Sequence, residues 1–139
     1  MSNERGHNPR ITVVNDNPEF LDLMDALLEQ DSGYDVTTID GDTLEDIEPI
    51  RGSRPDLLII DLRHRPDGLA GWDVLMAVRA DRELSELPII LCTGDLRALE
   101  EHAQAITDDP KVATLQKPFR LEELEARVRQ FVGEAMPSA

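Results

Sequence analysis

Five polar or charged residues are of the types that together can handle a phosphoryl group. Asn15 and Asp16 are adjacent, and Asp61, Thr93 and Lys117 each follow a short apolar run. A carboxylate can attack phosphorus to form an acyl phosphate, while an ammonium and a hydroxyl can bind the phosphoryl oxygens. Neighbouring carboxylates repel each other unless a cation lies between them, and Mg²⁺ suits such an oxygen-rich site. These residues predict Mg²⁺-assisted phosphoryl transfer to Asp61, provided that the fold brings them together.

The elements that must position these residues begin with short apolar runs. The runs cover residues 11–14, 57–60, 88–92 and 112–115, and the first three are nearly continuous. Uninterrupted apolar runs are typical of strands that are buried on both faces. A weaker strand is expected over 35–39. The pattern therefore predicts five strands.

Segments with helical periodicity separate these strands. The first helix is expected to have Asn17 as its cap, Pro18 at its first position and Gly33 just after its end. Pro49 predicts a second helix that is short or kinked. A third helix is expected over 71–79, and a fourth is expected to have Asp95 as its cap. The expected apolar face of the first helix consists of Phe20, Leu21, Met24, Leu27 and Leu28, and that of the third consists of Trp72, Leu75, Met76 and Val78. The fourth helix is expected to bury Leu96, Leu99, Ala103 and Ile106, and the last to bury Leu121, Leu124, Val128, Phe131 and Val132.

The alternation of strands and helices predicts the α/β class. We expect a doubly wound, five-stranded parallel sheet with right-handed crossovers and helices on both faces. Ligands of such sheets bind outside the carboxyl ends of the strands, where the strand order reverses. The polar residues named above all follow strands, so they are expected to converge on one edge of the sheet.

The composition limits the partners that the chain can have. Its 139 residues include 14 Lys and Arg against 29 Asp and Glu, a net charge of −15 that disfavours direct binding to nucleic acid or to a membrane surface. Cys92 is alone, and the N-terminus lacks the apolar core of a signal peptide. We expect one soluble, cytoplasmic domain over 1–139, with a core of about 11–132 and flexible tails at 1–9 and 134–139.

Four short motifs carry a resemblance to a known family. They are VVND at 13–16, LLIIDL at 57–62, LCTG at 91–94 and QKPF at 116–119. In this order and at the ends of the predicted strands, they resemble the receiver domains of two-component response regulators, in particular stand-alone receivers similar to the chemotaxis regulator. The resemblance covers about residues 11–132 and implies a flavodoxin-like sheet with strand order 2-1-3-4-5.

The resemblance also implies roles for individual residues. Asp61 matches the phosphoacceptor, Thr93 the switch hydroxyl and Lys117 the phosphate-binding lysine, which is commonly followed by a cis proline. Asp16 and Asp61 are expected to bind Mg²⁺ together with the backbone carbonyl of Arg63. Asn15 matches the first member of the family's acid pair, and it is either a metal ligand or only a cap or polar neighbour.

Three features depart from the family's pattern. Asn15 is an amide where the family usually has a carboxylate, so we expect weaker Mg²⁺ binding. The loop after Asp61 is about two residues longer and more basic than usual. The aromatic residue that many receivers rotate corresponds to Thr114, which has no ring.

These expectations lead to one preferred function and to alternatives. The preferred function is a stand-alone response regulator receiver that takes a phosphoryl group from a sensor histidine kinase or a phosphotransfer protein and signals through contact with a downstream protein. It is not expected to be an enzyme, apart from phosphotransfer and dephosphorylation of its own aspartate. The alternative is a pseudo-receiver that binds its partner without phosphorylation. A phosphatase or a flavin-binding enzyme is weakly supported, because no glycine-rich phosphate loop follows the first strand.

Overall fold

The computed structural model describes residues 8–31, 33–61, 71–94 and 96–133. Within these ranges five strands form one parallel sheet in the order β3-β2-β4-β5-β6. Their bounds are β2 (Arg10–Asn15), β3 (Asp35–Asp40), β4 (Leu57–Asp61), β5 (Ile89–Thr93) and β6 (Val112–Gln116). Counted along the chain this is the order 2-1-3-4-5, so the predicted flavodoxin-like sheet is confirmed.

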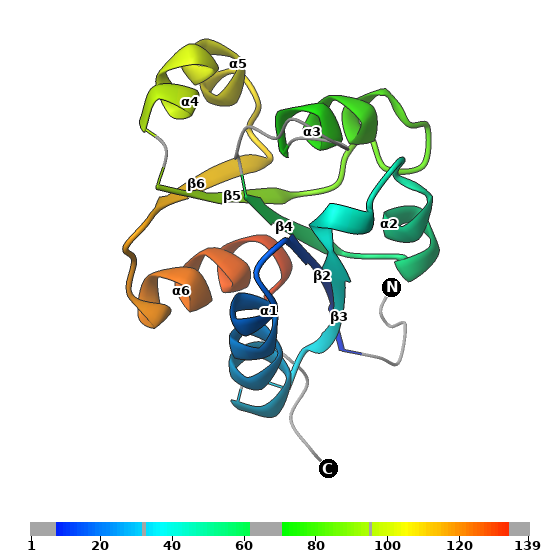
Figure 1. Cartoon of the computed structure of the whole chain (residues 1–139), viewed down its shortest axis with the longest axis vertical. Helices are drawn as coiled ribbons and strands as arrows, with labels where there is room; N and C mark the ends of the chain where they lie inside the picture. The colour runs from blue at the N-terminus through cyan, green and yellow to red at the C-terminus, as the bar shows by residue number, and fades with distance from the viewer. Residues whose placement is uncertain (1–7, 32, 62–70, 95, 134–139) are drawn as a thin grey trace.

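Helices cover both faces of the sheet (Figure 1). One face carries α1 (Pro18–Met24), its π-helical continuation η1 (Asp25–Asp31) and α6 (Leu121–Val132). The other face carries α2 (Glu48–Ser53), α3 (Gly71–Ala80), α4 (Leu96–Glu101) and α5 (Ala103–Thr107), and a short 3₁₀ turn, η2 (Gly41–Thr43), precedes α2. The domain is therefore a three-layer α/β/α sandwich.

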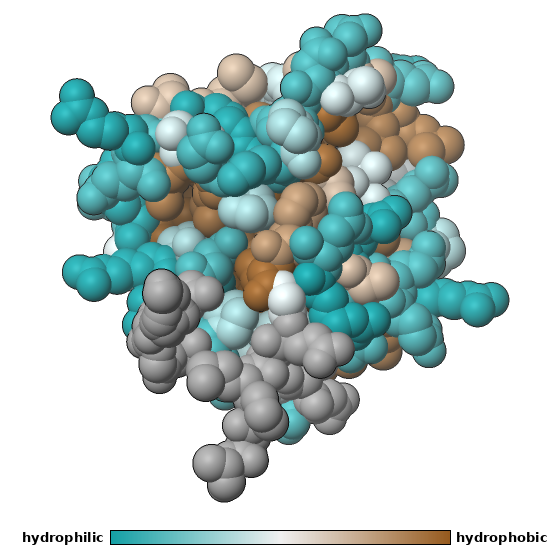
Figure 2. Space-filling model, turned by 180° about the vertical axis from the view of Figure 1, so that it is seen from behind, coloured by the Kyte–Doolittle hydropathy of each residue, from teal (hydrophilic) through white to brown (hydrophobic). Residues whose placement is uncertain are grey.

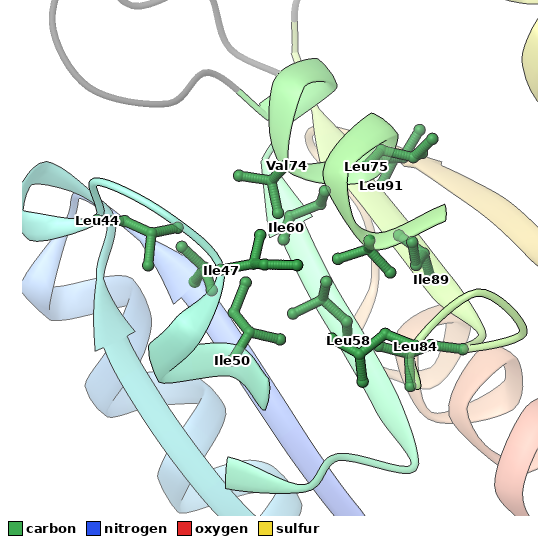
Figure 3. Packing of buried hydrophobic residues seen from close by; sticks show 13 residues of the cluster. Leu44, Ile47, Ile50, Leu58, Ile60, Val74, Leu75, Leu84, Ile89 and Leu91 are labelled. Carbon is green, nitrogen blue, oxygen red and sulfur yellow. The ribbon is translucent and has the colours of Figure 1, made fainter. Parts of the chain in front are cut away.

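The buried core forms one cluster on each side of the sheet, because successive side chains of a strand point to opposite faces. In the cluster between the sheet and α2 and α3, Leu58 and Ile60 of β4 pack with Ile50 of α2 and Val74 of α3 (Figure 3). The opposite cluster contains Val13 and its neighbours under α1 and α6. The central strands are apolar on both faces for this reason, as their uninterrupted runs predicted.

The ends of the first two helices follow the sequence signals. The Asn17 side chain caps α1 by accepting hydrogen bonds from the backbone N–H groups of Glu19 and Phe20. Gly33 has a φ of 82°, the left-handed conformation expected after a helix end. Helix α2 is only 6 residues long and contains Pro49 in its first turn, so the prediction of a short second helix is confirmed.

Several expectations about the helices are wrong. Leu96 and Leu121, both expected on apolar helix faces, are 52% and 39% exposed. The fourth helix is not continuous: it stops at Glu101 and resumes at Ala103, because the backbone of His102 leaves the helical region with φ −113° and ψ 14°. Met76, expected on the apolar face of α3, is 49% exposed. The buried stripe of α3 instead consists of Gly71, Val74, Leu75 and Val78, whose spacing of three and four residues turns Met76 towards solvent.

The tail expected over residues 1–9 is tied down at its described end. Asn8 Nδ2 donates to the carbonyl of Gly33, with a length of 2.7 Å, and the carbonyl of Pro9 accepts from the N–H of Asp35, with a length of 3.1 Å. The expected helix cap Asp95 and residues 62–70, which include Arg63, lie outside the described residues.

The surface reflects the charged composition. On the face drawn in Figure 2, hydrophilic side chains project over most of the area and hydrophobic atoms show between them. None of the helices in the described ranges combines the length and the apolar character that a membrane crossing requires.

Candidate functional site

The register of the central strands brings Asn15 and Asp61 together. Val14 of β2 pairs with Ile60 of β4, so the next residues, Asn15 and Asp61, are neighbours at the carboxyl ends of adjacent strands. Asn15 and Asp61 each lie two residues after a member of the core cluster under α1 and α6, namely Val13 and Ile59. Because side chains alternate along a strand, the side chains of Asn15 and Asp61 point to the face that α1 and α6 cover. This is the point at which the strand order reverses, where sheets of this class bind their ligands.

Lys117 completes the site from the other side of Asp61. Its Nζ donates to Asp61 Oδ2, with an N–O distance of 2.9 Å, although 56 residues separate the two in the chain. The Asp61 side chain is 10% exposed and that of Lys117 is 33% exposed. The ion pair is thus largely shielded from solvent, and its ammonium lies where it can also bind an oxygen of a group attached to Asp61.

Thr93 and Lys117 are joined through the backbone. The N–H of Lys117 donates to the carbonyl of Thr93, with a length of 2.8 Å, and the Lys117–Pro118 peptide bond is cis, as the resemblance implied. Thr93 is 1% exposed. Because Cys92 packs in the α1 and α6 cluster, alternation directs the Thr93 side chain to the other face, at the same sheet edge as Asp61.

The amide group of Asn15 has a defined orientation. Its Oδ1 accepts from the backbone N–H of Asn17, with a length of 2.8 Å. A backbone N–H can only donate, so this contact fixes which end of the amide is the oxygen. The side chain is buried, with 4% exposure, and within the part of the chain that the structure describes its Nδ2 has no hydrogen-bond partner. Asn15 therefore places a donor, rather than a second carboxylate, beside Asp61.

A cation fits the remaining polar atoms. Asp61 Oδ1 is buried and has no hydrogen-bond partner among the described residues, which is costly for a charged oxygen unless an ion or a donor satisfies it. Asp16, half-buried, directly follows the strand that ends beside Asp61. No three His, Cys, Asp or Glu side chains gather into a metal site within the described ranges. A hard cation here would thus rely on the two carboxylates, retained water and backbone oxygen, as Mg²⁺ does.

Cys92 is a near neighbour of the site but is not a second nucleophile. It pairs with Asp61 in the register of β4 and β5. Burial, reinforced by the charge of Asp61, raises the pKa of its thiol to about 12 despite the opposing charge of Lys117. Because the reactive form of cysteine is the thiolate, Cys92 stays protonated and inert at neutral pH.

Sequence reasoning missed one residue at the site, Phe20. The periodicity of the first helix places Phe20 only on its apolar face, yet Lys117 Nζ lies 5.0 Å from the centre of its ring. The sequence does hold a signal for this contact. Phe20 comes four residues, or about one helical turn, after Asp16, and this spacing places an aromatic residue beside the end of the first strand.

Comparisons with known proteins agree with this geometry. The response regulator receiver domain family matches residues 11–129. The DNA-binding response regulator MtrA of Mycolicibacterium smegmatis is 34% identical over 86% of the chain, and hybrid signal transduction histidine kinase D of Dictyostelium discoideum is 32% identical over 100% of it. The chain spans 49% of the first relative and 9% of the second.

A solved structure has the same fold. The receiver domain of a sensor histidine kinase from Pseudomonas aeruginosa, which holds a magnesium ion in its active site cleft, is 27% identical with a TM-score of 0.68. The similarity covers 91% of this chain and 98% of that domain. The family match and the strand order lead to the same conclusion: the chain belongs to the response regulator receiver domains, the signalling modules of two-component systems.

Proposed function

We propose that this receiver domain accepts a phosphoryl group on Asp61 from a phosphohistidine of a sensor histidine kinase or a phosphotransfer protein. The observation that carries the proposal is the state of the Asp61 carboxylate. One oxygen is held by Lys117 Nζ at 2.9 Å, while the other is buried and, in the described ranges, has no hydrogen-bond partner. A carboxylate that is held on one side and unsatisfied on the other is suited to take up a further group.

The chemistry follows from these groups. A carboxylate oxygen of Asp61 attacks phosphorus, the new O–P bond forms, and the P–N bond to the donor imidazole breaks, so the electron pair leaves with the nitrogen. Lys117 stabilises the negative charge on a phosphoryl oxygen, and Thr93 donates its hydroxyl to another. The product is an acyl phosphate, which stores the phosphoryl group as a signal.

Mg²⁺ is the proposed cofactor. Asp16 and Asp61 would hold it through their carboxylates, and the carbonyl of Arg63, which lies outside the described residues, is the proposed backbone ligand. When bound, the ion would shield an incoming phosphoryl group from the two carboxylates. Asn15 contributes no charge to these ligands. The affinity of the site for Mg²⁺ is therefore expected to be lower than that of a site with three carboxylates.

The proposed output is a contact with a downstream protein. Phosphorylation adds roughly two negative charges at pH 7, which Lys117 and the cation must offset locally, and the loops at this sheet edge then settle into another arrangement. We place the domain in the cytoplasm and propose no direct contact with nucleic acid or membrane, since the net charge of −15 opposes both.

The test is chemical phosphorylation followed by mapping. The protein is incubated with a small-molecule phosphodonor and Mg²⁺, and mass spectrometry should locate one hydroxylamine-sensitive phosphoryl adduct on Asp61. Asp61→Asn should abolish the adduct. The matched control is Asp40→Asn, because Asp40 also ends a strand at this edge but pairs on the far side of Asn15. Equal labelling of the Asp61 variant, or a stable adduct on serine, would refute the assignment.

A pseudo-receiver that works without phosphorylation is the second candidate, and Asn15 is the observation that favours it. The amide stands where the family usually has a carboxylate, and its oxygen already accepts from the backbone N–H of Asn17. If neither phosphorylation nor Mg²⁺ binding occurs in the wild-type protein, the second candidate replaces the first.

A further inference from the structure

The ammonium of Lys117 contacts two chemically different groups. On one side it donates to Asp61 Oδ2 at 2.9 Å, and on another it lies 5.0 Å from the centre of the Phe20 ring. A cation within about 6 Å of a ring centre is attracted by the negative face of the aromatic system. Phe20 therefore acts on the same ammonium that would bind the phosphoryl group.

The position of the Phe20 ring is set by the start of α1. Asn17 caps the helix, and its side chain accepts from the N–H of Phe20, which fixes the first turn. The ring is half-buried and packs against the cluster that contains Val13 and Ile59, the residues two positions before Asn15 and Asp61. The ring is thus fixed on the face of the sheet to which Asp61 points.

A lysine side chain needs such a contact to stay in one place. Its stem has four rotatable bonds, and holding it in a single geometry costs conformational entropy. The backbone of Lys117 is fixed by its bond to Thr93, but the ammonium lies at the far end of the stem. In this chain Asn15 offers it no charge, since its side chain is a neutral amide.

We propose that Phe20 is a positioning residue, whose ring face holds the Lys117 ammonium at Asp61 and keeps it ready for the phosphoryl group. The second half of this statement rests on the proposed function, whereas the first concerns the unmodified protein alone. The attraction comes from the electron-rich face of the ring and not only from its apolar bulk. It follows that a ring of the same shape without the negative face should fail.

The first experiment measures the order of the lysine side chains by NMR. The sequence contains two lysines, Lys111 and Lys117, so lysine-labelled protein gives an assignable pair of signals. Lys111 is the internal reference, because its side chain is 47% exposed and its ion pair with Glu86 is long, at 3.6 Å. In the wild type the end of the Lys117 side chain should be clearly more ordered than that of Lys111.

Three replacements of Phe20 separate the ring face from bulk packing. Phe20→Tyr keeps the face and should retain the order of Lys117. Phe20→Leu removes the ring, and pentafluorophenylalanine, introduced at this position alone, keeps the shape but reverses the charge of the face. Both should lower the order of Lys117 towards that of Lys111. If the fluorinated ring leaves Lys117 as ordered as phenylalanine does, the positioning role is wrong and Phe20 is packing alone.

The second experiment measures binding of beryllofluoride, a mimic of the phosphoryl group, in the presence of Mg²⁺. The fluorinated and leucine replacements should weaken binding roughly two- to fivefold, as expected for a partly exposed cation–π contact, and Phe20→Tyr should not. Unchanged affinity with lowered Lys117 order would overturn the claim that the ring serves the phosphoryl group. Absence of binding in the wild type would instead overturn the proposed function, while the NMR result would still decide whether Phe20 holds Lys117.

Discussion

Asn15→Asp should destabilise the metal-free protein and make its stability depend on Mg²⁺. The change places a negative charge at a side chain that is 4% exposed, on the strand next to Asp61 and on the same face. Adjacent strands are about 4.8 Å apart, and two unit charges about 5 Å apart repel by about 3 kcal/mol at an effective dielectric constant of 20. Attraction between the new charge and Lys117 offsets part of this cost.

The net loss of stability is therefore expected to be about 1–2 kcal/mol, or about 3–7 °C in melting temperature for a domain of this size. Added Mg²⁺ should reverse the loss, because an ion bound only by the folded state stabilises it by about 1.4 kcal/mol at ten times its Kd. The wild type should respond in the same direction but at higher Mg²⁺ concentration, since it has one carboxylate fewer at the site.

The assay is thermal unfolding followed by circular dichroism, with EDTA or with Mg²⁺ at matched ionic strength. Asn17→Asp is the matched control, because it adds the same charge two residues away, at an exposed cap position where aspartate is equally favourable. If both variants melt at the same temperature in EDTA, or if Mg²⁺ does not separate them, then position 15 does not face a cation site and the reasoning fails.

Two further predictions concern groups whose pKa departs from the usual value. Burial raises the pKa of Asp109, but the hydrogen bonds from Arg79 Nε, at 2.6 Å, and from the backbone outweigh it, so the pKa lies below its usual range. A lowered pKa contributes stability that is present above the unfolded value of 3.8 and is lost as the pH falls through the folded value. Asp109→Asn should thus lower the free energy of unfolding, measured with urea, by about 1–2 kcal/mol at pH 7 and by less at pH 3. An equal loss at both pH values would contradict the ion pair with Arg79. The thiol of Cys92, with its pKa near 12, should resist alkylation by iodoacetamide at pH 8 in the native protein and should react in urea. Rapid alkylation of the native protein would show that Cys92 is not buried at the end of β5.

The local patterns were sufficient for the architecture. Continuous apolar runs such as 57–60 occur where a strand is covered on both faces, and the Asn17–Pro18 pair marks a helix start by satisfying backbone groups that have no partner within the helix. Strand order and the convergence of Asp61 and Lys117 at one edge then follow from the few ways in which such units can be connected. These features depend on interactions within short segments, which is why the sequence is enough to predict them.

The break at His102 could not be predicted in this way. A spacing of three and four residues from Leu96 to Ile106 is compatible with one helix, and nothing local marks an end at His102. In the folded protein the His102 ring stacks on Trp72 of α3, with ring centres 3.8 Å apart. A contact between separate helices depends on how both pack on the sheet, which the periodicity of a single helix does not contain.

The finer structure of the site was also decided by tertiary packing. The sequence alone predicted that Asp61 and Lys117 lie at one edge and that Asn15 departs from the family's acid pair. It did not determine that the Asn15 oxygen would be taken by the N–H of Asn17, or that the ring of Phe20 would lie beside the Lys117 ammonium. Side-chain directions of this kind depend on register, alternation and helix placement acting together, and only the folded chain combines them.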